Sequence, residues 1–131
     1  MTIKIGINGF GRMGRLTMRA IFNQDDIDIT HINDPAGDAA TLAHLMNFDS
    51  VHGRWEHEAT AKEDTMLIGQ HKITLSHNKA IQETDWSACD VVIEASGKMK
   101  TKALLQAYLD QGVKRVIVTA PVKEDGVLNI V

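Results

Sequence analysis

The chain has 131 residues, enough for one domain of ordinary size and too few for two. Its hydrophobic fraction of 44% and charged fraction of 24% indicate a globular protein, while a net charge of −3 offers no basic surface for nucleic acid. It has neither an apolar run of the roughly 20 residues that span a bilayer nor a signal-peptide pattern, and its single cysteine is typical of a cytoplasmic protein.

The first part of the chain predicts a βαβ unit. Residues 2–8 alternate β-branched side chains as a strand does, residues 12–23 have helical spacing, and residues 27–33 predict a second strand. Two strands joined through a helix run parallel, so we expect them in one parallel sheet. A short helix is expected over residues 39–47, where Leu42, Leu45 and Met46 form an apolar stripe.

The pattern then changes to short runs separated by turn-prone pairs. Residues 58–62, 65–68 and 71–76 predict an antiparallel meander that is inserted after the second parallel strand. The parallel pattern resumes with residues 91–93 and 116–118, which are continuous apolar runs, as in strands buried on both faces. A helix between them covers residues 100–111 and ends before Gly112.

Residues 128–131 look like the start of a further strand. Chains seldom end inside a strand, because the unpaired edge would be exposed. We therefore expect residues 1–131 to form one domain that is truncated at its C-terminal end. The predicted class is α/β, with a Rossmann-type doubly wound, mainly parallel sheet and an antiparallel insertion.

The strongest motif is a glycine turn between the first strand and the first helix. Gly9 permits the tight turn, Gly11 lets the backbone approach a diphosphate, and Gly14 allows the helix to pack closely on the strand. The amides of Arg12 and Met13 at the helix N-terminus are placed to bind the phosphates. The pattern predicts a dinucleotide site, although glycine turns also occur as plain tight connections.

Asp34 directly follows the second predicted strand, about 20 residues after Gly14, which is the separation at which an acid reaches the adenosine ribose. A carboxylate there accepts hydrogen bonds from the ribose hydroxyls and repels a 2′-phosphate, which favours NAD over NADP. The alternative is that Asp34 and Pro35 are a turn-forming pair that closes the strand. Spacing and position together favour the cofactor.

Two later strand ends face the same crevice in a doubly wound sheet. Ser96 and Gly97 follow the third expected parallel strand, and Thr119 follows the fourth. Ligands bind outside the carboxyl ends of such strands, and small residues there let a cofactor pass close to the backbone. Ordinary turn residues would look the same, and position alone does not separate the two interpretations.

Five stretches of the sequence resemble glyceraldehyde-3-phosphate dehydrogenases, in the order of that family and over the whole chain. They are residues 6–15, 32–34, 48–53, 94–97 and 114–121, and the first, GINGFGRMGR, is highly specific. The resemblance implies an NAD-binding domain. By position in the family, Arg12 and Met13 would hold the diphosphate and Asp34 the adenine ribose, while Gly97 and Thr119 would lie near the nicotinamide and its ribose.

Two positions depart from the family's pattern. Lys79 stands where the family has an arginine that lines the adenine pocket, and lysine lacks the planar fork of arginine. Met13 replaces an isoleucine that packs against the nicotinamide, and methionine is a tolerable apolar substitute. The expected cofactor-binding residues are therefore Gly9, Gly11, Arg12, Met13, Gly14, Asp34, Lys79, Ser96, Gly97 and Thr119.

The family's catalytic residues have no counterpart in this sequence. The nucleophile lies in a Ser-Cys-Thr-Thr-Asn motif that the chain does not contain, and Cys89 precedes a buried strand as a packing residue. The resemblance implies that the full-length protein is a homotetramer whose cysteine attacks a phosphorylated aldehyde. Hydride would pass to NAD, and phosphate or arsenate would release the acyl group. This chain alone is expected to bind NAD without turnover.

Within the family, residues 33–46 are closer to the branch associated with arsenate resistance, and erythrose-4-phosphate dehydrogenase is a similar branch. The alternative function is a stand-alone, non-catalytic dinucleotide-binding module. A methyltransferase also places glycines after its first strand, but Gly14 inside the helix favours a dinucleotide. The spacing of His44, His52 and His57 fits no zinc pattern, so no metal is expected.

Overall fold

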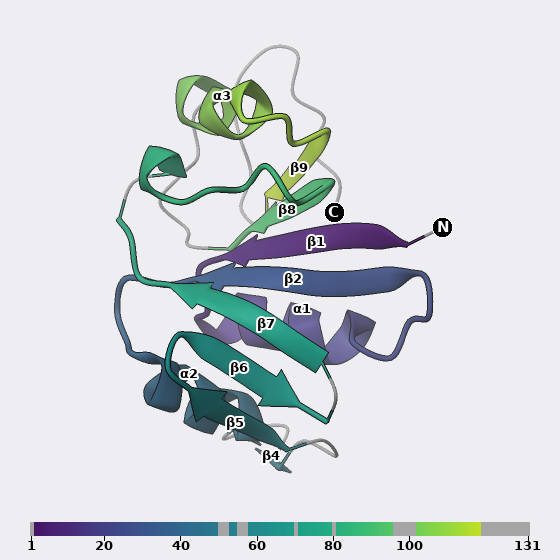
Figure 1. Cartoon of the computed structure of the whole chain (residues 1–131), viewed down its shortest axis with the longest axis vertical. Coiled ribbons are helices and arrows are strands. Elements are labelled where there is room, and N and C mark those ends of the chain that lie inside the picture. Colours follow the sequence, from purple (N-terminus) through teal and green to yellow (C-terminus); the bar gives the residue numbers. More distant parts are fainter. Residues whose placement is uncertain are drawn as a thin grey trace.

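A computed structural model describes residues 2–49, 53–54, 58–69, 71–79, 81–95 and 102–118. Its centre is a seven-stranded sheet with the order β5-β6-β7-β2-β1-β8-β9 (Figure 1). Five strands run parallel: β1 (Ile3–Asn8), β2 (Ile27–Asn33), β7 (His71–Ser76), β8 (Val91–Glu94) and β9 (Arg115–Val118). β5 (Ala59–Lys62) and β6 (Thr65–Ile68) extend the sheet in antiparallel pairing beyond β7.

The remaining elements surround this sheet. The helices are α1 (Arg12–Ile21), α2 (Ala39–Asn47) and α3 (Lys102–Asp110), with a 3₁₀ turn η1 (Ile81–Glu83), and β3 (Phe48–Asp49) pairs with β4 (Gly53–Arg54). α1 and α2 lie on the same face of the sheet (Figure 1). Among the described residues, no helix is long and apolar enough to cross a membrane.

The strand order confirms the predicted fold class. β1 lies between β2 and β8, so the chain winds outward from β1 first in one direction and then in the other. In doubly wound sheets, ligands bind at the carboxyl ends of the strands where this direction reverses. The carboxyl ends of β1, β2 and β8 are therefore the edge at which a ligand is expected.

The predicted antiparallel pairing of β5, β6 and β7 is confirmed. The prediction missed that β7 also pairs in parallel with β2, His31 opposite Thr74 and Asn33 opposite Ser76. β7 is thus the third parallel strand, and the strands that begin at Val91 and Arg115 are the fourth and fifth. The alternation of buried and exposed residues in β7 shows which face of the strand packs against the core. It does not show whether a neighbouring strand runs parallel or antiparallel.

The element boundaries agree closely with the predicted ones. α1 ends at Ile21, two residues before the expected end, and the backbone of Phe22 closes it through a bond to Met18 O. Gly112 adopts φ +98° just after α3, which is the left-handed conformation expected of a glycine that ends a helix. The predicted strand at residues 128–131 lies outside the described residues.

The sheet has a buried apolar cluster on each face. Neighbouring strand residues point to opposite faces, and in β8 Val92 belongs to one cluster while Ile93 belongs to the other. Beneath α3, Trp86 packs so close to β1 that a Cβ on Gly6 would lie 2.8 Å from the indole ring. Cys89 is buried in the same cluster, and burial raises the pKa of its thiol, as befits a packing residue.

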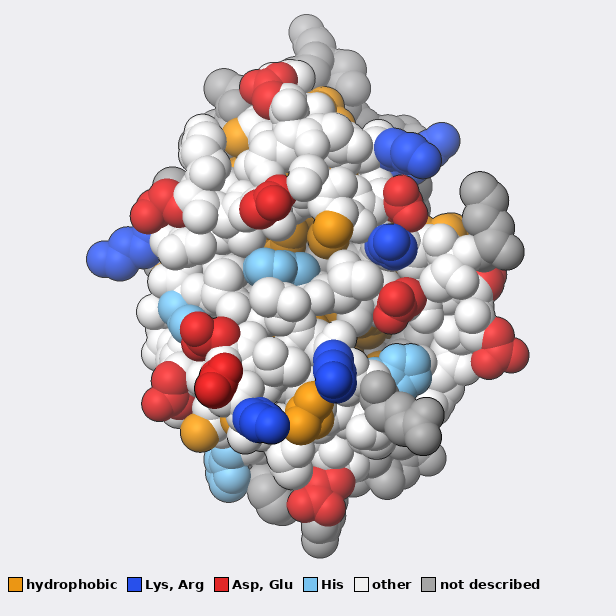
Figure 2. Space-filling view, viewed as in Figure 1, with side chains coloured by type: hydrophobic (Ala, Val, Ile, Leu, Met, Phe, Trp, Pro, Cys, Tyr) orange, Lys and Arg blue, Asp and Glu red, His pale blue; other side chains and the backbone are white. Residues whose placement is uncertain are grey.

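The charged side chains are of mixed sign over one broad face of the molecule. In Figure 2, Lys and Arg side chains are scattered among Asp and Glu side chains. A mixed distribution of this kind carries no extended field of one sign that would steer a polyanion to this face.

Candidate cofactor site

The turn between β1 and α1 has the geometry of an anion-binding loop. Gly9 adopts φ +96°, a left-handed conformation that favours glycine, and its N–H donates to Asn33 O at 2.7 Å. Gly11 is the N-cap of α1 and provides no side-chain cap. The first helical bond runs from Arg15 N to Gly11 O at 3.0 Å. The amides that precede Arg15 therefore have no partner within α1, and they point out at the positive end of its dipole.

The glycines of this turn meet different surroundings. A Cβ on Gly14 would lie 2.2 Å from Gly9 O and 3.4 Å from Ile7 Cγ2, so α1 packs directly on the turn. A Cβ on Gly11 would meet nothing within 4 Å. Gly14 is therefore required by the protein itself, whereas the space at Gly11 is open to a ligand.

Asp34 lies beside this turn and binds it. Its Oδ2 accepts a hydrogen bond from the Phe10 amide at 2.6 Å, and its Oδ1 accepts one from the Ala36 amide at 2.7 Å. A carboxylate has about four acceptor positions, so roughly two are left for a ligand. A cavity of about 160 Å³ opens here, lined by Phe10, Gly11, Arg15, Asp34, Ala36, Gly37, Thr41, Leu42 and Leu45.

A buried polar network lies beneath the same edge of the sheet, and the sequence interpretation missed it. Asn8 Nδ2 donates to Glu94 Oε1 at 2.8 Å and to the Tyr108 hydroxyl at 2.7 Å. The Tyr108 hydroxyl in turn donates to Glu94 Oε1 at 2.5 Å. Burial, together with the Glu94 carboxylate, holds the pKa of Tyr108 far above its usual range, so this hydroxyl stays a donor. The network ties α3 to the carboxyl ends of β1 and β8.

The network continues through Asn33 to β7. Asn33 Nδ2 donates to Asn8 Oδ1 at 2.8 Å. Asn33 Oδ1 accepts from Ser76 Oγ at 2.6 Å and from the Asn78 amide at 3.0 Å. In this way buried and half-buried side chains join the carboxyl ends of the four neighbouring strands β7, β2, β1 and β8. The sequence does carry one sign of this network: each of these four strands ends in a polar residue, namely Asn8, Asn33, Ser76 and Glu94.

Most of the sequence-predicted residues come together at this edge. Gly9, Gly11, Arg12, Met13 and Gly14 form the turn and the first turn of α1, and Asp34 lies beside them. Lys79 is exposed and follows the end of β7, one residue after Asn78. Ser96, Gly97 and Thr119 lie outside the described residues, although β8 and β9 end as a pair at Glu94 and Val118.

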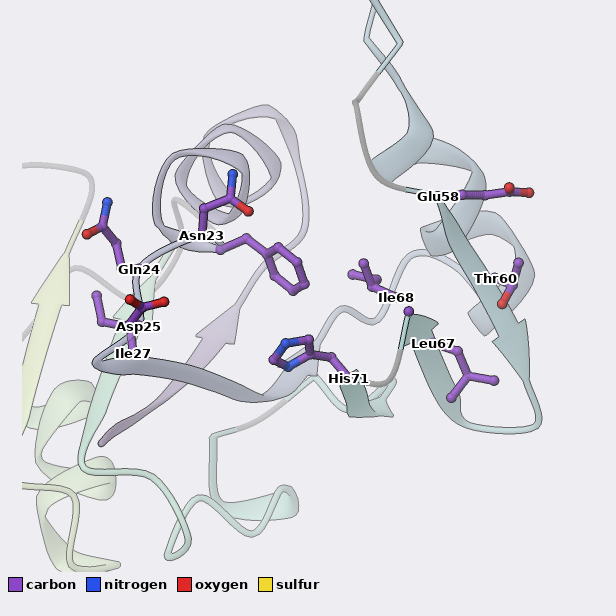
Figure 3. A pocket seen from close by; sticks show the side chains of 11 residues that line it. Asn23, Gln24, Asp25, Ile27, Glu58, Thr60, Leu67, Ile68 and His71 are labelled. Atoms are coloured by element: carbon purple, nitrogen blue, oxygen red, sulfur yellow. The ribbon is translucent and has the colours of Figure 1, made fainter. Parts of the chain in front are cut away.

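A second and larger hollow, of about 960 Å³, lies at the opposite edge (Figure 3). Gln24 and Asp25 from the turn after α1 line one side of it, and Thr60 of β5 and Leu67 of β6 line the other. It is wide and faces the amino ends of β2 and β7, which is not the edge where doubly wound sheets bind ligands. We therefore assign it no part in the cofactor site.

The histidines expected to bind no metal are only partly described. His44 is exposed on α2, whereas His52 and His57 lie outside the described residues. Within the part of the chain that the structure describes, no group of three or more His, Cys, Asp or Glu residues could hold a metal ion.

The sheet order, the glycine turn and the acid beside it define a Rossmann-type nucleotide-binding α/β domain. The family model described as "Glyceraldehyde 3-phosphate dehydrogenase, NAD binding domain" matches residues 3–102. The chain belongs to this family.

The sequence similarity to individual relatives extends over nearly the whole chain. It is 45% identical to glyceraldehyde-3-phosphate dehydrogenase 3 of Nostoc sp. (strain PCC 7120 / SAG 25.82 / UTEX 2576), over 100% of the chain and 39% of that protein. It is 37% identical to glyceraldehyde-3-phosphate dehydrogenase 2 of Bacillus subtilis (strain 168), over 97% of the chain and 38% of that protein. The cytosolic enzyme of Pisum sativum is 38% identical, over 93% of the chain and 37% of that protein. The chain thus spans well under half the length of these relatives.

Proposed function

We propose that residues 1–131 are one domain that binds NAD at the carboxyl edge of the sheet. The diphosphate lies against the amides of Arg12 and Met13, and the Asp34 carboxylate accepts hydrogen bonds from the adenine ribose. The observation that carries this proposal is the bond of 2.6 Å from the Phe10 amide to Asp34, because it holds the acid against the glycine turn. The family's own description as an NAD-binding domain supports the same cofactor.

The other predicted contacts belong to the same proposal. Lys79 flanks the adenine from the end of β7, and Met13, whose side chain is 52% exposed, packs on the nicotinamide. Ser96, Gly97 and Thr119 border the nicotinamide half of the cofactor. The negative charge of Asp34 makes NAD the preferred cofactor over NADP.

The test compares NAD, NADP and S-adenosylmethionine by calorimetry with the purified chain. We expect NAD to bind most tightly and Asp34→Ala to weaken it about tenfold or more, since hydrogen bonds to a charged group contribute about 1.5–3 kcal/mol. Asp34→Ala also removes the bonds to two backbone amides, so the ratio of NAD to NADP affinity is the sharper readout, and it should fall.

Asp110→Ala is the control, because this acid is exposed on α3 and, among the described residues, its side chain accepts a hydrogen bond only from nearby Gln106. It should leave both affinities unchanged. An unaltered NAD affinity in Asp34→Ala, or a preference for S-adenosylmethionine, would contradict the proposal.

For the whole protein we propose the activity that the names of the relatives print, a glyceraldehyde-3-phosphate dehydrogenase. The expected reaction oxidises a phosphorylated aldehyde through a cysteine thioester, with phosphate or arsenate as acyl acceptor, in a cytoplasmic homo-oligomer. The residues of this chain bind and orient the cofactor, and the substrate chemistry is attributed to the part of the relatives that the chain does not span. The arsenate-associated branch, the erythrose-4-phosphate branch and a stand-alone dinucleotide-binding module remain alternatives within this proposal.

A direct assay separates cofactor binding from catalysis. The 131-residue chain, given glyceraldehyde 3-phosphate, NAD and either phosphate or arsenate, should bind NAD and form no NADH, because the Ser-Cys-Thr-Thr-Asn motif is not in the sequence. NADH formation that is lost in Cys89→Ser would contradict this expectation and would assign a catalytic role to the buried thiol.

A further inference from the structure

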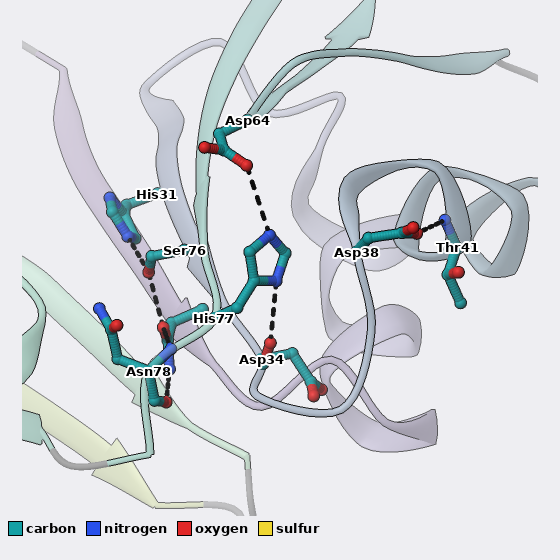
Figure 4. Close-up of polar contacts among 9 residues, drawn as sticks. His31, Asp34, Asp38, Thr41, Asp64, Ser76, His77 and Asn78 are labelled. Carbon is teal, nitrogen blue, oxygen red and sulfur yellow. Dashed lines mark hydrogen bonds and ion pairs between the residues drawn. The ribbon is translucent and has the colours of Figure 1, made fainter.

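His77 connects three segments that are distant in the sequence. It follows β7, and its Nδ1 lies 3.1 Å from the main-chain oxygen of Asp34, at the end of β2. Its Nε2 lies 3.6 Å from Asp64 Oδ1, in the turn between β5 and β6 (Figure 4). Asp38, at the start of α2, is close enough to interact electrostatically with the ring. The ring thus bridges the Asp34 main chain and the Asp64 carboxylate, with the Asp38 carboxylate as a further acid that interacts with it electrostatically.

The hydrogen-bonding chemistry of the ring depends on its protonation. Because the Asp34 carbonyl oxygen can only accept, Nδ1 must carry a proton. In the neutral ring, Nε2 is then an acceptor that faces the Asp64 carboxylate, which is also an acceptor. Nε2 is buried and has no hydrogen-bond partner among the described residues. Only the protonated ring can donate toward both Asp34 and Asp64 at once.

The residue that His77 holds is the acid of the candidate cofactor site. The Asp34 main chain bonds to His77, while its carboxylate accepts from the amides of Phe10 and Ala36. The β5–β6 turn is itself fixed to β7, because the Leu75 amide donates to Asp64 O at 2.8 Å. A continuous chain of contacts therefore runs from the β5–β6 turn through His77 and Asp34 to the glycine turn.

We propose that His77 is a positioning residue for the cofactor site: its protonated form pairs with Asp64 and holds Asp34, so that NAD binds more tightly when His77 is protonated. This inference rests on the proposed function, since NAD is the ligand whose affinity changes.

The first test measures NAD affinity by calorimetry between about pH 6 and 8, where histidine side chains titrate. We expect the affinity of the unmodified protein to rise about two- to fivefold toward pH 6, as for one partly exposed ion pair. His77→Asn keeps a donor near the Asp34 carbonyl and cannot titrate, so its profile should be flat. Asp64→Asn keeps the size of the side chain and removes its charge, so it should make the profile shallower than that of the unmodified protein.

A matched control comes from a histidine at the other end of β7. His71 begins β7 at the opposite edge and packs edge-on against Phe22, at 5.0 Å between ring centroids. His71→Asn should keep the slope of the unmodified protein. A flat profile in the unmodified protein, or a full slope in either His77→Asn or Asp64→Asn, would overturn the inference.

A second readout needs no cofactor. In the NAD-free protein, the NMR shift of the Ala36 amide should follow the titration of the His77 ring, and Asp64→Asn should reduce that response. If the protein binds no NAD at any pH, the proposed function fails, whereas this titration still decides whether His77 acts on Asp34. If the shift of the Ala36 amide does not change as His77 is protonated, the proposed connection between His77 and Asp34 is wrong.

Discussion

At the residue scale, the two glycines that flank the start of α1 differ in what they serve. Gly14 is in contact with the protein's own backbone, since its Cβ position is 2.2 Å from Gly9 O. Gly11 borders open space that the protein does not fill. Gly14 thus serves the packing of α1, whereas in the proposed function the open space at Gly11 admits the cofactor.

This difference predicts that substitution by alanine lowers stability at Gly14 and lowers NAD affinity at Gly11. Gly14→Ala should lower the free energy of unfolding by about 2–3 kcal/mol, because backbone would have to move to admit the methyl group. Gly11→Ala should change it by less than about 1 kcal/mol while weakening NAD binding, since the methyl group occupies the proposed diphosphate position. Urea unfolding and calorimetry on both variants measure the two effects. Equal stabilities for the two variants would show that α1 is not packed as tightly as described.

At this scale the sequence predicted the glycine turn and the acid Asp34. It did not predict the buried hydrogen-bond network that lies beneath them. A glycine motif is local, so its spacing can be read directly from the chain. The network is long-range: Asn8 bonds to Glu94 and to Tyr108, which are 86 and 100 positions away. Nothing in the spacing of these three residues indicates that they meet, since contact across strands depends on strand order and register.

At the element scale, the sequence predicted where the strands lie better than how they pair. The ranges of β2, β6 and β7 coincide with the expected runs. The parallel pairing of β7 with β2 was missed, because β7 follows β6 through a short turn and looks like the last strand of a meander. The connection from β2 to β7 is in fact one long crossover that contains α2, β5 and β6. This pairing matters for the site, because it brings Ser76, His77 and Asn78 to the edge that holds Asp34.

At the scale of the whole molecule, Tyr108 should make the free energy of unfolding decrease at alkaline pH. It is the only tyrosine in the sequence, and it is fully buried. Burial and the neighbouring Glu94 carboxylate raise its pKa above the value of about 10 that it has in the unfolded chain. A raised pKa of this kind stabilises the fold fully below pH about 10, and that contribution is lost as the pH rises further, because only the unfolded chain releases the proton.

We therefore expect the free energy of unfolding to fall above pH about 10, with Tyr108 adding up to about 1.4 kcal/mol per pH unit. Tyr108→Phe should be less stable near neutral pH by about 1–3 kcal/mol, since Asn8 and Glu94 lose a buried partner, and its decline above pH 10 should be shallower. Urea unfolding at several pH values measures both slopes. Tyrosinate absorbance that develops while the protein is still folded would contradict the expectation.

The joined carboxyl ends of β7, β2, β1 and β8 have a consequence for the thermodynamics of association. Side chains that are already fixed by one another lose little conformational freedom when a ligand arrives, so the entropic cost of ordering is met during folding. A preorganised edge of this kind also behaves as a unit. Substitutions at Asn8, Asn33 and Tyr108 should therefore show energies that do not add, even where none of these side chains touches the bound molecule.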